Sequence, residues 1–171
     1  AWADYVFVSA MIVQRDSARA LIARCKEAGV KVVAGGPLFT MEHERFPDVD
    51  HFVLNEAELT LPPFLADLAN GGARRIYTTT EFPDIQQTPA PLWRLVNLKH
   101  YDTVSIQFSR GCPFNCDFCN VTALLGHRPR LKTAAQIIAE LDSLYALGWR
   151  KSVFFVDDNF IGNKKKLKSE V

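Results

Sequence analysis

The sequence predicts an α/β protein built on parallel sheets. Short apolar runs rich in β-branched residues, such as residues 5–10 and 30–34, are typical of strands that are buried on both faces. Stretches with helical periodicity that stop at glycine follow them, and this alternation produces an open, doubly wound sheet. A second alternation of strand and helix begins near residue 104, after a proline-bearing interval, and indicates a second unit.

The first unit is expected to contain four strands, the last of them a short edge strand. The strands are predicted at residues 5–10, 30–34, 51–54 and 75–79. Helices are predicted at residues 16–28 and 57–70, with one helical turn at 41–46. Gly29 and Gly71 follow the two helices, because glycine readily adopts the left-handed conformation that ends a helix. The buried stripe of the first helix is expected at Ala20, Leu21, Cys25 and Ala28.

The second unit is expected to begin with a strand over residues 104–109 and to continue with a helix over 133–147 and a strand over 152–156. Thr133 and Gln136 have the spacing of a capping box, which starts a helix. The buried stripe of this helix is expected at Ile137, Ile138, Leu141, Leu144 and Tyr145. We therefore predict domains at residues 1–79 and 102–171, joined by a linker over 80–101 in which Trp93 and Leu95 act as anchors.

Composition narrows the class of protein. Hydrophobic residues make up 48% of the chain, charged residues 23%, and the net charge is +1, which favours neither a nucleic-acid nor a membrane surface. No apolar run approaches the roughly 20 residues that span a bilayer, and no signal peptide opens the chain. The four cysteines do not suggest a disulfide framework, so we expect a reducing, cytoplasmic compartment.

Both ends of the sequence fall inside predicted elements. The chain opens within an apolar strand pattern, and it stops in "NKKKLKSEV", where a new helix is expected to begin. We therefore expect a fragment of a longer protein that is inactive by itself.

Three cysteines fall within eight residues in "SRGCPFNCDFC". Cys112, Cys116 and Cys119 directly follow the predicted strand over 104–109, and parallel sheets place their chemistry at such strand ends. Thiolates are soft ligands that suit zinc, copper(I) or iron–sulfur clusters. Zinc would need a fourth ligand, for which His127 is the available residue, and an electron-transfer cluster normally takes four cysteines. A four-iron cluster on three cysteines leaves one iron open to another ligand.

The spacing C-x-x-x-C-x-aromatic-C resembles the signature of radical S-adenosylmethionine (radical SAM) enzymes. The flanks "SIQFSRGCPFNCDFCNVTALLGHRPRLKT" and "VFFVDDNFIGNKK" resemble the branch with a cobalamin-binding domain ahead of the radical domain. The resemblance implies the C-terminal half of a doubly wound, Rossmann-like cobalamin-binding domain, followed by the start of a radical SAM partial (β/α) barrel.

The resemblance also implies roles for residues of the second unit. Cys112, Cys116 and Cys119 would hold three irons of a [4Fe–4S] cluster, whose open iron chelates S-adenosylmethionine. One electron then cleaves the cofactor to methionine and a 5′-deoxyadenosyl radical. Phe118 matches the aromatic position whose backbone typically lies near the adenine. Asp157 and Asp158 fall where many members carry a Gly-Gly-Glu that contacts the amino group, although strand-end carboxylates also serve as turn and capping residues.

In the first unit, Ser9 and the pair Gly35-Gly36 match small residues that accommodate the nucleotide tail of cobalamin in the family. The physical reason is steric, since glycine leaves room where backbone approaches a ligand. Gly35-Gly36-Pro37 is also ordinary turn chemistry, which is the alternative. "NEAE" resembles a Gly-Glu-x-Glu stretch, with Asn55 in place of glycine. The histidine loop that ligates cobalt in many cobalamin domains is not found in this sequence.

The function that the resemblance implies is a cobalamin-dependent radical SAM enzyme, a methyltransferase acting on an unactivated carbon, in a branch that includes hopanoid methylases. The cofactors would be the [4Fe–4S] cluster, S-adenosylmethionine and cobalamin. The expected partners are a small-molecule or lipid substrate and an external electron donor such as flavodoxin or ferredoxin. Two alternatives are a radical SAM oxidoreductase or cyclase without methyl transfer, and a non-catalytic cobalamin- or metal-binding sensor. The residues that act on the substrate are not identified.

Overall fold

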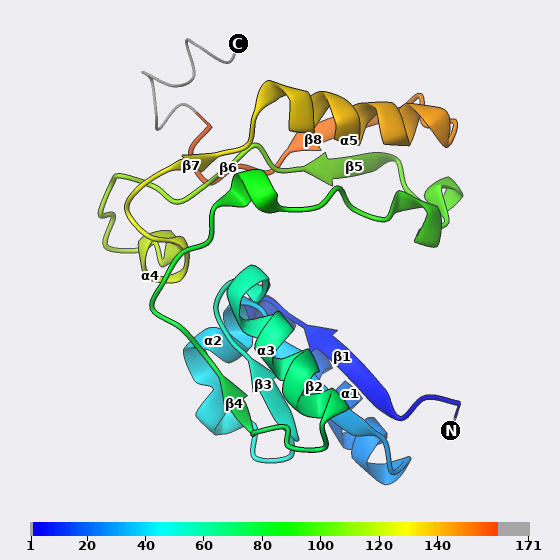
Figure 1. The fold of residues 1–171 in the computed structure, drawn as a ribbon, viewed down its shortest axis with the longest axis vertical. Coiled ribbons are helices and arrows are strands. Elements are labelled where there is room, and N and C mark those ends of the chain that lie inside the picture. Colours follow the sequence, from blue (N-terminus) through cyan, green and yellow to red (C-terminus); the bar gives the residue numbers. More distant parts are fainter. Residues whose placement is uncertain (1, 161–171) are drawn as a thin grey trace. The chain divides into compact units, whose positions relative to one another are not determined.

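The computed structural model describes residues 2–160, and the chain divides into two compact units between Pro83 and Asp84 (Figure 1). Both units are α/β, and each contains parallel strand pairing. The predicted fold class is therefore confirmed. Within the described residues, no helix combines the length and the apolar character that crossing a membrane requires.

The first unit is built on a four-stranded parallel sheet with the order β1-β2-β3-β4. The strands are β1 (Tyr5–Ser9), β2 (Lys31–Gly35), β3 (His51–Val53) and β4 (Ile76–Tyr77). The register pairs Ser9 with Gly35 and Gly35 with Val53. The carboxyl ends of three strands therefore lie in line at one end of the sheet.

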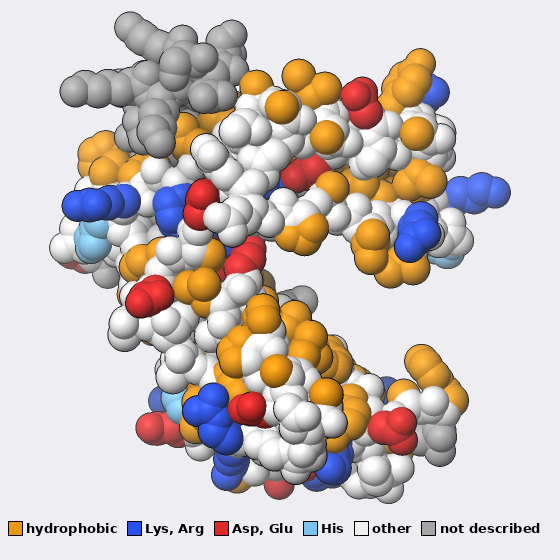
Figure 2. Space-filling model, in the orientation of Figure 1, with side chains coloured by type: hydrophobic (Ala, Val, Ile, Leu, Met, Phe, Trp, Pro, Cys, Tyr) orange, Lys and Arg blue, Asp and Glu red, His pale blue; other side chains and the backbone are white. Residues whose placement is uncertain are grey.

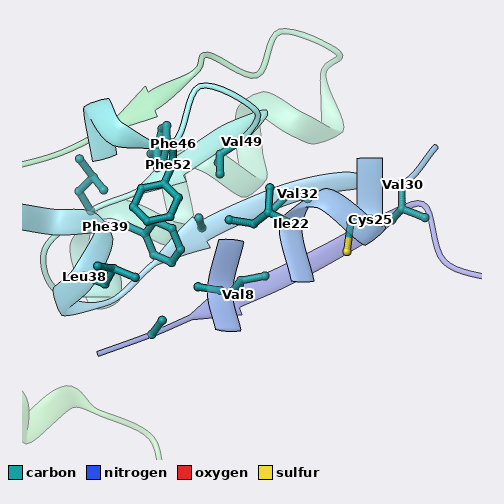
Figure 3. Packing of buried hydrophobic residues seen from close by; sticks show 14 residues of the cluster. Val8, Ile22, Cys25, Val30, Val32, Leu38, Phe39, Phe46, Val49 and Phe52 are labelled. Atoms are coloured by element: carbon teal, nitrogen blue, oxygen red, sulfur yellow. The ribbon is translucent and has the colours of Figure 1, made fainter. Parts of the chain in front are cut away.

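Helices cover both faces of this sheet. They are α1 (Arg15–Glu27), α2 (Pro37–Glu42) and α3 (Ala57–Ala69), with short 3₁₀ turns at Ile12–Gln14 and His43–Arg45. Side chains alternate between the two faces of a strand, and the neighbours Val32 and Val33 lie in different hydrophobic clusters. The first cluster contains residues of α1 and α2 together with Val32 (Figure 3). The second contains Val33 and Phe64 of α3, so α3 packs on the opposite face.

Two details of the first unit differ from the sequence prediction. The buried stripe of α1 consists of Ala18, Ile22 and Cys25, whereas Leu21 is 40% exposed. This spacing of four and three residues is the stripe that one helix face presents to a sheet. The predicted helical turn at 41–46 is part of a longer helical segment that begins at Pro37, because proline is favoured at the first helical position.

The second unit contains two small sheets. Strands β5 (Thr103–Ile106) and β8 (Ser152–Phe155) pair in parallel, and β6 (Ser109–Arg110) pairs with β7 (Arg130–Leu131) in antiparallel orientation. The helices are α4 (Val121–Leu125) and α5 (Ala134–Ala146), and 3₁₀ turns lie at Ile85–Gln87, Trp93–Leu95 and Leu98–His100. The predicted strand over 104–109 is thus two strands, because the chain leaves β5 after Ile106 to pair with β7.

The capping box of α5 is confirmed, since Gln136 N donates to Thr133 Oγ1 at 3.2 Å and Thr133 N donates to Gln136 Oε1 at 2.9 Å. The predicted stripe of this helix is wrong at two positions. Ile138 is 57% exposed and Tyr145 is 62% exposed, and hydrophobic side chains reach the surface along α5 in Figure 2. Leu95, predicted as an anchor, is 75% exposed, whereas Trp93 packs against the core.

The inner face of α5 carries a charged residue that the apolar pattern did not reveal. Glu140 is 2% exposed and forms an ion pair with Lys132, which is 5% exposed. Burying two charges is tolerated only when they are paired at short range. The pair therefore occupies space in the core that a wider apolar stripe would have filled.

Candidate functional site

The three cysteines of the second unit lie on the loop between β6 and α4. All three are free thiols, and Cys112 is partly buried whereas Cys116 and Cys119 are exposed. A turn joins the last two, because the backbone N–H of Cys119 donates to the carbonyl of Cys116 at 3.0 Å. The loop therefore has one thiol at its protected base and two at its open side.

The base of this loop is tightly packed at Gly111. Its φ of +92° lies in the left-handed region, and a Cβ there would lie 2.9 Å from the carbonyl oxygen of Arg128 and 3.0 Å from that of Gly126. The next residue, Cys112, donates its backbone N–H to the Gly126 carbonyl at 3.1 Å. Only glycine fits this position, and the packing holds the first cysteine against the end of α4.

The acidic end of β8 contacts the same loop. Asp157 accepts hydrogen bonds from the backbone N–H of Ser109 and from the Ser109 hydroxyl, the latter at 2.7 Å. Ser109 is completely buried, so these contacts lie in a protected environment. Asp157 thus joins the end of β8 to the start of β6.

The two residues after Asp157 point to different parts of the loop. Asp158 accepts a hydrogen bond from the backbone of Gly111, and burial raises the pKa of its carboxyl, with the Asp157 carboxylate adding to the increase. The side-chain amide of Asn159 donates to Cys112 Sγ at 3.6 Å. The structure therefore brings Asp157, Asp158 and Asn159 to the base of the cysteine loop, whereas the sequence left open which aspartate has which role.

Phe118 lies apart from these contacts. Its side chain is 94% exposed, and it precedes Cys119 on the open side of the loop. The structure gives this ring the accessibility that a ligand contact needs, but it does not bring the ring against Asp157 or Asp158.

Among residues 2–160, no three His, Cys, Asp or Glu side chains are gathered closely enough to hold a metal ion. The chemistry of the donors nevertheless fits an iron–sulfur cluster, since three free thiols lie on one loop and an amide donor reaches the first of them. A hydrogen bond to sulfur is the kind of support that a thiolate ligand receives from its surroundings.

In the first unit, the structure brings Ser9, Gly35 and Gly36 together at the carboxyl ends of β1 and β2. They line a groove of about 290 Å³ whose other residues include Phe7, Val33, Val53 and Asn55. A Cβ on Gly35 would lie 2.6 Å from the Val53 carbonyl oxygen, and one on Gly36, whose φ is +84°, would lie 2.6 Å from Ser9 Oγ. Both glycines are therefore required by close packing, and their backbone is accessible from the groove.

Asn55 is a groove residue whose role the sequence did not reveal. It has a φ of +63°, which costs least for glycine and is tolerated by asparagine. Its Oδ1 accepts from Thr78 Oγ1 at 2.7 Å and from the backbone N–H of Thr79 at 3.4 Å. The sequence did contain one indication of this conformation, since asparagine stands here where the family that the chain resembles has glycine. The left-handed backbone explains why these two residues can replace each other.

The fold and the site define an α/β protein with a three-cysteine loop directly after β6, the short strand that follows the parallel strand β5. Residues 106–169 match the family model of the Radical SAM superfamily. It is 47% identical over 169 residues to the uncharacterised methyltransferase sll1242 of Synechocystis sp., covering 98% of this chain and 32% of the relative. It is 39% identical over 169 residues to the hopanoid C-2 methylase of Rhodopseudomonas palustris, covering 96% of this chain and 32% of the relative.

A solved structure has the same fold. The cobalamin-dependent S-adenosylmethionine radical enzyme OxsB with aqua-cobalamin bound superimposes with a TM-score of 0.71 at 19% identity, covering 93% of this chain and 26% of that chain. The present chain spans about a third of the length of the two curated relatives.

Proposed function

We propose that this chain is part of a cobalamin-dependent radical SAM enzyme that transfers a methyl group to an unactivated carbon. The observation that carries the proposal is the cysteine loop, which has three free thiols directly after β6, the short strand that follows the parallel strand β5, and lies within the segment that matches the superfamily. The contacts of the β8 end to this loop add support, because they bring two carboxylates and an amide to the base of the thiol set.

Cys112, Cys116 and Cys119 would hold the [4Fe–4S] cluster, which when bound supplies the electron that cleaves S-adenosylmethionine. The chain's own residues then have separate tasks. Asp157 accepts two hydrogen bonds from Ser109, whereas Asp158 accepts one from the Gly111 backbone, so Asp158 has more acceptor capacity left to receive the ammonium group of the cofactor. The exposed ring of Phe118 offers an apolar surface to the adenine.

The groove of the first unit would take the nucleotide tail of cobalamin. Ser9, Gly35 and Gly36 present backbone and a small hydroxyl to it, and larger side chains at the two glycines would collide with Val53 and Ser9. The similarity of fold to a cobalamin-bound enzyme supports this use of the groove. On this proposal the cobalamin-binding part is residues 1–79, the linker 80–101 and the radical SAM part 102–171.

Methyl transfer is the reaction that the relatives favour, since two of them are named as a methyltransferase and a hopanoid methylase. We propose a small-molecule or lipid substrate and an external low-potential electron donor of the flavodoxin or ferredoxin kind. Free thiols are stable in a reducing compartment, and we therefore place the protein in the cytoplasm.

The test starts with the protein that carries this chain, purified anaerobically and reconstituted with iron and sulfide. We expect a brown protein with an electron paramagnetic resonance (EPR) signal of a reduced [4Fe–4S] cluster, bound cobalamin, and cleavage of S-adenosylmethionine to methionine and 5′-deoxyadenosine. Cys112→Ala, Cys116→Ala and Cys119→Ala should each lose the cluster. Cys25→Ala is the matched control, because this fourth cysteine lies in α1 of the other unit and should have no effect on iron content.

Different outcomes separate the alternatives. A colourless, zinc-containing protein that leaves S-adenosylmethionine intact would contradict the enzyme proposal. Cleavage without any methylated product, assayed in extracts with isotope-labelled methyl donor, would favour a radical oxidoreductase or cyclase. Bound cobalamin without cleavage by a cluster-loaded protein would favour a sensor.

A further inference from the structure

The end of β8 and the base of the cysteine loop are joined by a set of contacts that is more specific than packing. The backbone N–H and the hydroxyl of Ser109 both donate to the carboxylate of Asp157. The Ser109 hydroxyl also lies 3.5 Å from the backbone carbonyl oxygen of Asn159. Because Ser109 is fully buried, these bonds hold the backbone of Asn159 in place. The segment from Asp157 to Asn159 is therefore tied to Ser109 at both of its ends.

Cys112 is fixed from the opposite side. Its backbone N–H donates to Gly126, and it follows Gly111, whose surroundings leave no room for a side chain. The side-chain amide of Asn159 donates a hydrogen bond to the sulfur of Cys112, with an N···S distance of 3.6 Å. Cys112 is also the least exposed of the three loop thiols, so this contact is less open to competition from water.

We infer that Asn159 raises the reduction potential of the [4Fe–4S] cluster by donating a hydrogen bond to the Cys112 thiolate. This inference rests on the proposed function, because it assumes that Cys112 is a cluster ligand. An N–H donor to a ligand sulfur withdraws electron density, and it stabilises the reduced cluster, which carries one more negative charge than the oxidised cluster. The reduction is a single-electron step, and a low-potential external reductant supplies the electron.

Asn159 thus acts through Cys112 and need not touch S-adenosylmethionine. The contact length of 3.6 Å indicates a modest bond. Removing the donor should therefore lower the ratio of reduced to oxidised cluster at a fixed ambient potential by between about twofold and thirteenfold, the range that the net contribution of a typical protein hydrogen bond allows. For a one-electron couple, about 59 mV corresponds to tenfold.

The test is a redox titration of the reconstituted protein, in which the EPR signal of the reduced cluster is quantified against ambient potential. Asn159→Leu keeps the approximate shape of the side chain and removes the donor, and Asn159→Asp removes the donor and adds a negative charge. Both should shift the midpoint to more negative values, and Asn159→Asp should shift it further. Neither measurement depends on turnover.

The matched control is Asn97→Asp. Asn97 lies in the same unit, and its side-chain oxygen accepts from the backbone N–H of Lys99 at 3.3 Å, a bond that aspartate preserves. This change adds the same charge without altering a contact to a loop thiol, so the midpoint should stay at the wild-type value.

Each outcome decides a separate question. If wild type and both Asn159 variants hold the cluster with the same midpoint, the inference is overturned and the proposed function stands. If wild type holds no cluster, the proposed function fails and the inference fails with it. If Asn159→Leu loses iron, the role of the amide is tested with the isosteric variant Asn159→Asp instead. In that case, a midpoint of Asn159→Asp equal to that of Asn97→Asp would refute the role of the amide.

Discussion

The bond between Asp157 and Ser109 gives the most direct test of how the second unit is held together. Asp157→Ala removes a carboxylate that accepts two hydrogen bonds from a completely buried serine. After the substitution, the Ser109 hydroxyl keeps a long contact to the Asn159 carbonyl at 3.5 Å, whereas the backbone N–H loses its carboxylate acceptor. We therefore expect this substitution to destabilise the second unit strongly.

The magnitude follows from the two Ser109 donors, since the third donor to Asp157, the Phe108 backbone N–H at 3.4 Å, makes a longer and weaker bond. A buried group left without a partner costs about 1–3 kcal/mol, and a hydrogen bond to a charged acceptor contributes about 1.5–3 kcal/mol. Because the hydroxyl keeps part of its bonding, the two effects together come to about 2–4 kcal/mol. Asp157→Asn, which retains one oxygen acceptor, should cost about half as much.

The assay is urea unfolding followed by tryptophan fluorescence. Trp149 is 7% exposed and Trp93 packs in the core of the second unit, whereas Trp2 is fully exposed and contributes little change on unfolding. With a urea dependence of about 1 kcal/mol/M for a unit of this size, the midpoint should fall by about 2 M or more. Asp142→Ala is the control, since this exposed carboxylate on α5 should change the stability by less than about 0.5 kcal/mol.

A double-mutant cycle identifies the bond itself. Ser109→Ala removes the hydroxyl, and combining it with Asp157→Ala should cost less than the sum of the two single changes by about 1 kcal/mol. The reasoning is refuted if Asp157→Ala unfolds at the same urea concentration as Asp142→Ala, or if the two changes are strictly additive.

Three further predictions concern other parts of the chain. Asn55→Ala should destabilise the first unit more than Asn55→Gly does, by about 1 kcal/mol from the left-handed backbone, as measured by circular dichroism in urea; equal losses would show that only the side-chain bonds matter. Glu140→Ala should cost about 3–5 kcal/mol by leaving the Lys132 charge buried, and Lys132→Met combined with Glu140→Leu should recover most of it in the fluorescence assay; a double variant no better than Glu140→Ala would contradict this. Burial opposes ionisation of Asp50, but hydrogen bonds from the Val32 backbone and from Lys26 outweigh the effect of burial and lower the pKa of the Asp50 carboxyl below 3.8. The ionised carboxylate therefore stabilises the fold above this pH, and the stabilisation is lost as the pH falls through the folded-state pKa. The difference in stability between wild type and Asp50→Asn should therefore shrink from pH 7 to pH 3, and a difference independent of pH would exclude the charge as its source.

The parts of the fold that follow from local sequence could be predicted. The capping box at Thr133 joins residues three positions apart, and Gly29 ends α1 with a φ of +70°. The spacing of Cys112, Cys116 and Cys119 is likewise local, because a short loop determines how far its own thiols can separate. Such features depend on neighbouring residues alone, so the sequence already contains their physical causes.

The faces of the helices were harder to predict, because a face is defined by what packs against it. Several apolar residues of α5 satisfy a helical stripe, but Ile138 and Tyr145 are exposed while Glu140 points inward to Lys132. In α1, Ile22 is buried and its neighbour Leu21 is 40% exposed. Hydrophobicity identifies the helix, whereas the rotation of the helix is decided by the sheet beneath it.

The sequence by itself determined the fold class and the thiol loop, whereas the tertiary structure decided which residues surround the loop. Asp157 and Asn159 reach Ser109 and Cys112 across separations of 48 and 47 residues, respectively, which no local pattern encodes. These contacts exist because β5 and β8 pair in parallel, so that the carboxyl ends of both strands meet at one end of the sheet. Backbone pairing between strands that are distant in the sequence therefore decides which residues contact the cysteine loop.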